Sequence, residues 1–129
     1  MISGRNLGNR FGQSAPLLFA EALADAPQAR AAVQHAASVF GRALYNLAVT
    51  LDSRVFVIGG SVWLHHGHWL LPLVDREIVT RMPALTHGVE IRTAALGELA
   101  SDLGALALVM PPAWQAAWRA QRPWQGLLP

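Results

Sequence analysis

The first half of the chain shows the clearest hydrophobic periodicity. Steps of three and four residues separate the apolar positions Val33, Ala37, Phe40, Leu44, Leu47 and Leu51. This spacing places one apolar stripe along a helix, so the sequence predicts an amphipathic helix from about Pro27 to Thr50. We expect Asp25 to cap the free N–H groups at its start, with Pro27 in the first turn.

Two shorter segments have the pattern of β-strands. Residues 55–58 form a continuous apolar run, which is typical of a strand buried on both faces of a parallel sheet. The run stops at Gly59-Gly60. Residues 89–94 alternate between apolar and polar, which predicts a second strand nearer the edge of the sheet.

Helices are predicted around these strands. Residues 16–24 carry one apolar face, residues 69–81 repeat apolar positions at helical spacing, and residues 99–110 are rich in small side chains. Pro72 is expected in the first turn of the 69–81 helix, because proline is tolerated there. The first dozen residues are polar and rich in glycine, so they predict a loop or a frayed first turn.

The predicted order is helix-helix-strand-helix-strand-helix, which indicates an α/β fold with parallel strands. Two strands make an incomplete sheet. Residues 1–110 hold the strands and the helices before the tail, and residues 111–129 form a tail rich in tryptophan and proline. We therefore expect the missing strands to come from the missing lobe of a longer protein or, through self-association, from a second copy of this chain.

Composition leaves two interpretations open. The 129 residues are 53% hydrophobic and 14% charged, with a mean hydropathy of +0.29, which is apolar for so short a chain. They form either a well-packed helical domain or a piece of a larger body whose other parts cover apolar surface. A membrane partner is not expected, because the longest apolar run is too short to span a bilayer.

The charged residues give no sign of a nucleic-acid partner. All ten basic residues are arginines, spread along the chain without a cluster, and the formal net charge is only +2. The chain has no cysteine, which excludes disulfides and thiolate zinc sites. A reducing, cytoplasmic setting is the natural expectation.

The glycine pair after the first strand is the main candidate for ligand binding. In parallel α/β sheets ligands gather at the carboxyl ends of strands, and glycine lets the backbone approach a ligand closely. Gly59, Gly60 and Ser61 therefore either bind a ligand or form a plain turn. Residues 65–68 (His-His-Gly-His) are interpreted as solvated loop residues, not metal ligands. No carboxylate pair has a spacing that suits catalysis, so no catalytic residue is assigned.

Several segments together resemble one known family. Residues 3–7 (Ser-Gly-Arg-Asn-Leu) lead into a helix, residues 55–62 end as Gly-Gly-Ser-Val, and Leu96-Gly97 precedes Leu103-Gly104-Ala105. Their order and spacing are similar to the C-terminal part of the ROK family, named for repressors, open reading frames and kinases. The Gly-Gly-Ser-Val form most resembles bacterial N-acetylmannosamine kinases.

The resemblance implies a partial actin/hexokinase-like (ribonuclease H-like) C-terminal lobe on the nucleotide side of an ATP cleft. Kinases of the family use ATP and Mg²⁺ to phosphorylate a hexose or an N-acylhexosamine, and its repressors sense sugars. By this resemblance Gly59, Gly60 and Ser61 contact the adenosine side of the nucleotide. Gly104 then opens a helix that packs beneath the glycine pair.

Other parts of the family pattern are absent from these residues. They include the Asp-Gly-Thr phosphate loop, the Asn-Asp pair that carries the catalytic base, and the cysteine cluster that binds structural zinc. We therefore expect nucleotide contacts without catalysis by this chain alone, and sugar binding only with the missing half. The alternative is a non-catalytic sugar-sensing or oligomerisation module of a ROK-type transcriptional repressor.

Overall fold

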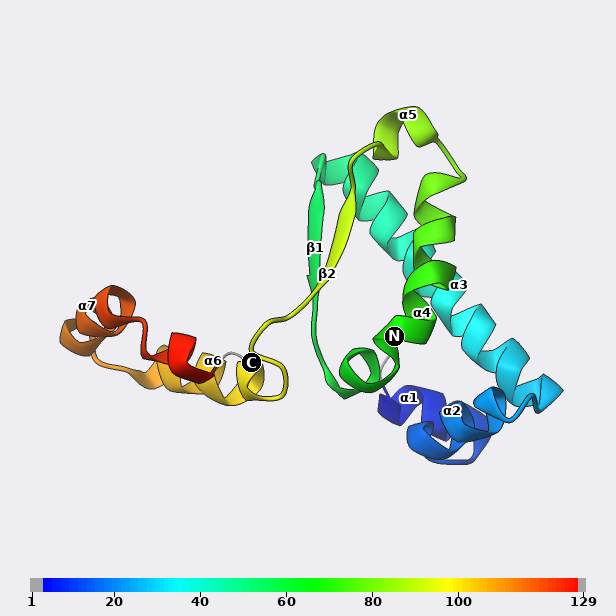
Figure 1. The fold of residues 1–129 in the computed structure, drawn as a ribbon, viewed down its shortest axis with the longest axis horizontal. Coiled ribbons are helices and arrows are strands. Elements are labelled where there is room, and N and C mark those ends of the chain that lie inside the picture. Colours follow the sequence, from blue (N-terminus) through cyan, green and yellow to red (C-terminus); the bar gives the residue numbers. More distant parts are fainter. Residues whose placement is uncertain (1–3, 128–129) are drawn as a thin grey trace.

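The computed structural model describes residues 4–127, and it confirms the α/β architecture (Figure 1). In chain order the elements are α1 (Gly4–Phe11), α2 (Ala15–Leu23), α3 (Pro27–Leu51), β1 (Val55–Ile58), α4 (Ser61–Val79), α5 (Pro83–Thr86), β2 (Glu90–Thr93), α6 (Leu99–Val109), α7 (Pro112–Gln121) and the 3₁₀ turn η1 (Pro123–Leu127). Ser3, at the start of the resemblance described above, lies outside the described residues. None of the described helices combines the length and apolar character that crossing a membrane requires.

The two strands form a parallel sheet that is covered on one face. Strand β1 pairs with β2 in the register from Val55 opposite Glu90 to Ile58 opposite Thr93. The inward side chains, such as Phe56 and Ile91, pack against the core shared with α3 and α4. The sheet is incomplete, as the sequence predicts.

The expectation that β1 is buried on both faces is wrong for this chain. Val55 and Val57 point to the face away from α3 and α4, and they are 46% and 67% exposed. The prediction assumed the layered arrangement of parallel sheets, in which helices cover both faces. Here α3 and α4 supply one layer, and the second layer is not formed within the described residues (Figure 1).

The core lies where α3 and α4 pack against each other and against α2. The largest fully buried side chains are Phe19, Leu18, Ile78, Val33 and Val74. Gly41 of α3 is buried at the point of closest approach, because an added Cβ would lie 2.8 Å from the Val74 carbonyl oxygen. Small residues on α3 therefore set the separation of the two helices.

Local predictions at three helix starts differ from the structure. Residues 4–11 form helix α1, where the sequence predicts only a loop or a frayed first turn. Helix α4 begins at Ser61, so Pro72 lies inside it; tertiary packing of its apolar stripe outweighs the hydrogen bond that a proline removes. Asp25 does not cap α3. Its φ is 62°, its carboxylate contacts Arg30, and the N-cap position is Ala26 without a side-chain bond.

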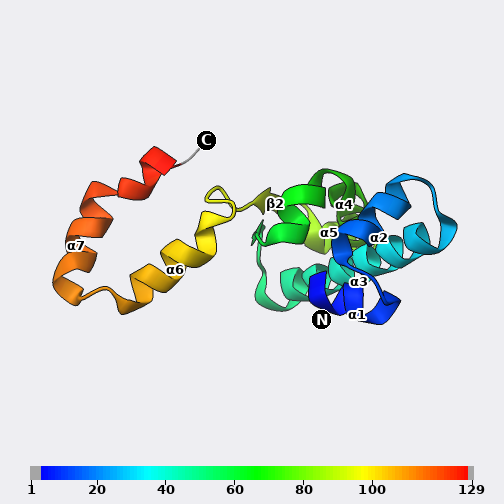
Figure 2. The ribbon, with the colours of Figure 1, turned by 90° about the horizontal axis from the view of Figure 1, so that it is seen from below.

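Helices α6 and α7 extend away from the rest of the molecule as an arm. Figures 1 and 2 show them, in yellow to red, on the far side of the sheet from α1 to α3, with a clear separation from the body in both views. Neither helix has a buried residue. Residues 128–129, the end of the predicted tail, lie outside the described residues.

Candidate functional site

The turn between β1 and α4 gives the candidate site its backbone. Gly60 has φ 92° and ψ 153°, a conformation that favours glycine, and it occupies the N-cap of α4 without a side-chain hydrogen bond. The first helical bond from this cap runs from the Leu64 N–H to the Gly60 carbonyl oxygen at 3.0 Å. Helix geometry leaves the N–H groups of Ser61, Val62 and Trp63 without a helical acceptor, so this turn presents a partial positive charge.

A mainly apolar hollow of about 540 Å³ opens beside this turn. It is lined by Phe40, Leu44, Phe56, Val57, Ile58, Gly59, Gly60, Ser61, Val62, Trp63 and Leu70. The Trp63 side chain is held in the wall, because its Nε1–H donates to the Thr93 hydroxyl oxygen at 3.1 Å and its ring meets Phe40 edge-on at 6.1 Å. The structure thus brings Gly59, Gly60 and Ser61 together at the rim of a preformed cavity.

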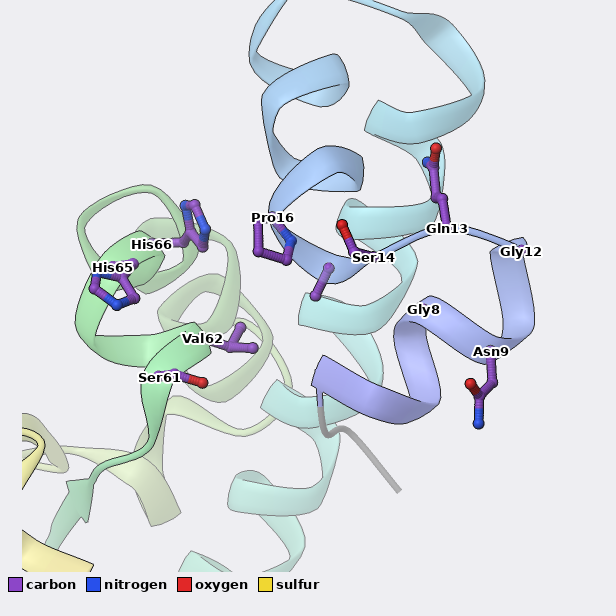
Figure 3. Close-up of a pocket in the computed structure, with 11 residues that line it drawn as sticks. Gly8, Asn9, Gly12, Gln13, Ser14, Pro16, Ser61, Val62, His65 and His66 are labelled. Carbon is purple, nitrogen blue, oxygen red and sulfur yellow. The ribbon is translucent and has the colours of Figure 1, made fainter.

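A second hollow of about 830 Å³ adjoins the first at Ser61 and Val62. It lies between the α1–α2 connection and the first turns of α4 (Figure 3). Its walls carry the amides and hydroxyls of Asn9, Gln13 and Ser14, together with imidazoles from α4. This hollow is not predicted from the sequence, because it depends on how α1 and α2 pack against α4.

The histidines near this hollow lie on helix α4, so their interpretation as loop residues is wrong. The His66 ring stacks on Phe19 at 4.0 Å with an interplanar angle of 2°. Burial lowers the pKa of His66, and the neighbouring charges of His65 and His68 lower it further. The His65 Nε2 lies 3.4 Å from a Glu98 carboxylate oxygen. No group of three potential metal ligands comes together anywhere in residues 4–127.

The structure keeps Gly104 apart from the glycine pair. It lies in the middle of the exposed helix α6, and an added Cβ there would meet no atom within 4 Å. Because α6 belongs to the arm, no helix packs beneath Gly59 and Gly60 in the way that the resemblance implies (Figure 1). Three of the four predicted site residues thus share one place, and the fourth does not join them.

Both hollows have chemical features that suit the binding of a ligand. Their lining residues include no aspartate or glutamate, so neither wall offers a carboxylate as a general base. The apolar hollow suits a flat ring, and the N-terminus of α4 suits an anion or a hydroxyl oxygen. The arrangement therefore fits a ligand with both an apolar ring and polar oxygens.

Comparison with known proteins identifies a family. The model of the ROK family matches residues 1–111, which is most of the chain. No curated protein and no solved structure matches the chain. The matched region includes α1 to α6 and the glycine turn after β1. The chain therefore belongs to the ROK family.

Proposed function

We propose that this chain is the nucleotide-side half-lobe of an ATP-dependent kinase for a hexose or an N-acylhexosamine such as N-acetylmannosamine. Membership of the ROK family supports a sugar kinase or a regulator of that family. The observation that carries the nucleotide assignment is the Gly60 turn, with φ 92°, at the rim of the 540 Å³ hollow. Its position at the carboxyl end of a parallel strand is where such folds bind ligands.

In this proposal the apolar hollow accepts the adenine ring, and Trp63 forms part of its wall. The ribose or phosphate oxygens accept hydrogen bonds from N–H groups at the start of α4, where the helix dipole favours negative charge. Mg²⁺ would be held mainly by the phosphates, as is usual for this ion, because the walls carry no carboxylate. This half-lobe supplies binding and orientation, while phosphoryl transfer needs charge stabilisation from the rest of a kinase.

Nucleotide binding is tested by titrating the chain with a fluorescent N-methylanthraniloyl derivative of ATP. We expect saturable binding that Gly60→Ala weakens at least tenfold, because an alanine at φ 92° displaces the turn. Gly88→Ala is the matched control. Gly88 also has positive φ, 76°, and open space around it, but it lies just before β2 at the other end of the sheet. Equal loss of affinity in both variants would show that strain in the fold, and not the site, controls binding.

The isolated chain is expected to show no sugar phosphorylation. Its lining residues offer no carboxylate as a general base, and the Asp-Gly-Thr and Asn-Asp motifs of the family do not occur in its sequence. The measurement is a coupled assay for ADP release with ATP, Mg²⁺ and either glucose or N-acetylmannosamine. Turnover above the background, abolished by Gly60→Ala, would contradict the half-lobe assignment.

The second candidate is a non-catalytic sugar-sensing or oligomerisation module of a ROK-type transcriptional repressor. The absence of acidic side chains from both hollows is equally compatible with it, since a sensor needs no catalytic carboxylate. The titration with the fluorescent ATP derivative distinguishes the two proposals. A repressor module of this kind is expected to leave the fluorescent nucleotide unbound in the wild-type chain.

A further inference from the structure

The chain exposes more surface than a compact protein of its mass. Its accessible surface is 8585 Å². A folded monomer of 13.9 kDa is expected to expose roughly 6,700 Å², so the excess is roughly 1,900 Å². A stable protein–protein interface takes about 800 Å² from each partner. The excess is therefore ample for a dimer.

One part of this surface is the uncovered face of the sheet. Val55 and Val57 project from it in β1, and their register partners Glu90 and Arg92 lie beside them in β2. These two charged residues form an ion pair with each other, with Arg92 Nη2 and Glu90 Oε2 2.5 Å apart. The face therefore offers apolar side chains with no unbalanced charge, which suits coverage by an apolar helix.

The second part is helix α6. Its sequence, LASDLGALALV, is apolar on every side and contains one charged residue, Asp102. A helix of this kind is ordinarily buried, yet none of its residues is. Leu108 and Val109 are 87% and 78% exposed. Helix α6 thus has the apolar composition expected of a helix that covers the exposed face of such a sheet.

The linker between β2 and α6 directs the helix away from its own sheet. The Ala94 N–H donates to the Ile58 carbonyl oxygen at 2.8 Å, which holds the start of the linker at the end of β1. Gly97 then turns the chain with φ 55°, and Glu98 lies against His65 of α4. The arm leaves the body in this direction and stays separate from it in both views (Figures 1 and 2).

We propose that helix α6 of a second copy of this chain covers the Val55–Val57 face of the sheet, and that the two copies exchange these helices reciprocally. Both complementary surfaces lie on one chain, so a twofold dimer satisfies both at once. Each sheet then has helices on both faces, as parallel sheets require. The exchange is independent of the nucleotide assignment, and its test uses no nucleotide.

The test combines light scattering with site-directed crosslinking of the full chain. Because the chain has no cysteine, single cysteines can be introduced without background. Tagged Val57→Cys chains are mixed with untagged Leu108→Cys chains, equilibrated and treated with a short bismaleimide. We expect a tagged–untagged product joined between positions 57 and 108, and a wild-type mass of twice 13.9 kDa by light scattering. Replacing Leu108→Cys by Leu23→Cys, an exposed position on α2, is expected to reduce that product at least fivefold.

Two results would overturn the exchange. A Val57→Cys/Leu108→Cys double variant that crosslinks within one chain, at monomer mass, would show that α6 folds back on its own sheet. A monomeric wild-type chain without mixed product would show that the face is free or is covered by a different protein. Far-ultraviolet circular dichroism of each variant checks that the helices are retained, and an unfolded variant is replaced by Val55→Cys or Val109→Cys, which test the same two surfaces.

Discussion

At the scale of single residues, His66 links the stability of the chain to pH. Its ring stacks on Phe19 in the core, and burial is the main reason that its pKa is lowered. The unfolded chain therefore binds more protons than the folded chain at mildly acidic pH. Stability is fully present above the ordinary histidine pKa of about 6.5 and is lost as the pH falls below it towards the folded value.

His66→Phe is expected to remove this part of the pH dependence while keeping the aromatic contact. We expect the variant to lose less stability than the wild type between pH 7.5 and pH 5.5, as measured by urea unfolding. His35→Gln, at an exposed position on α3, is expected to keep the wild-type slope. If His66→Phe and the wild type lose stability in parallel, the acid sensitivity comes from other groups.

At the scale of elements, the contact between α3 and α4 depends on Gly41. A Cβ at this position would lie 2.6 Å from the Glu77 Cβ and 2.8 Å from the Val74 carbonyl oxygen, so the helices would have to separate. The same contact carries a hydrogen bond in which the Ser38 hydroxyl donates to a Glu77 carboxylate oxygen at 2.8 Å. Separation of the helices would weaken both the packing and this bond.

Gly41→Ala is therefore expected to lower the free energy of unfolding by about 1–3 kcal/mol, although alanine is the better helix former. Asn46→Ala, at an exposed position on the same helix, isolates helix propensity and is expected to be neutral or slightly stabilising. Chemical denaturation of the three proteins measures the differences. A Gly41→Ala variant as stable as Asn46→Ala would mean that the two helices can adjust without cost.

The elements that sequence predicts well are those whose pattern is local. The apolar stripe of α3 predicted a helix from about Pro27 to Thr50, and the structure has Pro27–Leu51. The apolar run of β1 and the glycines after it predicted the strand and its turn. The predicted helix began at residue 69, whereas α4 begins at Ser61. Its buried positions continue back through Gly67 to Trp63, but the histidines and glycine in this stretch resemble a loop.

Features that depend on packing between distant segments could not be predicted in this way. The larger hollow needs Ser14 of the α1–α2 connection to face Ser61 of α4, which no local pattern reveals (Figure 3). Helical spacing places Val62 and His66 on one side of α4, but it does not show which segment lies opposite them. The expected helix beneath the glycine pair is displaced, because the linker at Gly97 carries α6 into the arm.

At the scale of the whole molecule, helix exchange couples folding to association. A dimer that is more stable than its separate chains has a melting temperature that rises with protein concentration, because unfolding releases two chains. For a hundredfold increase in concentration, mass action contributes about 2.7 kcal/mol, which corresponds to a rise of roughly 5–10 °C for a body of this size. Differential scanning calorimetry measures this rise directly.

Leu108→Asp places a charge on the apolar surface of α6 and is expected to give a melting temperature that is lower and independent of concentration. Leu23→Asp, the same change at an exposed position on α2, is expected to keep the wild-type dependence, since the proposed exchange does not involve α2. A wild-type melting temperature that stays constant across the range would mean that the exposed sheet face of one chain and α6 of another are not joined in solution.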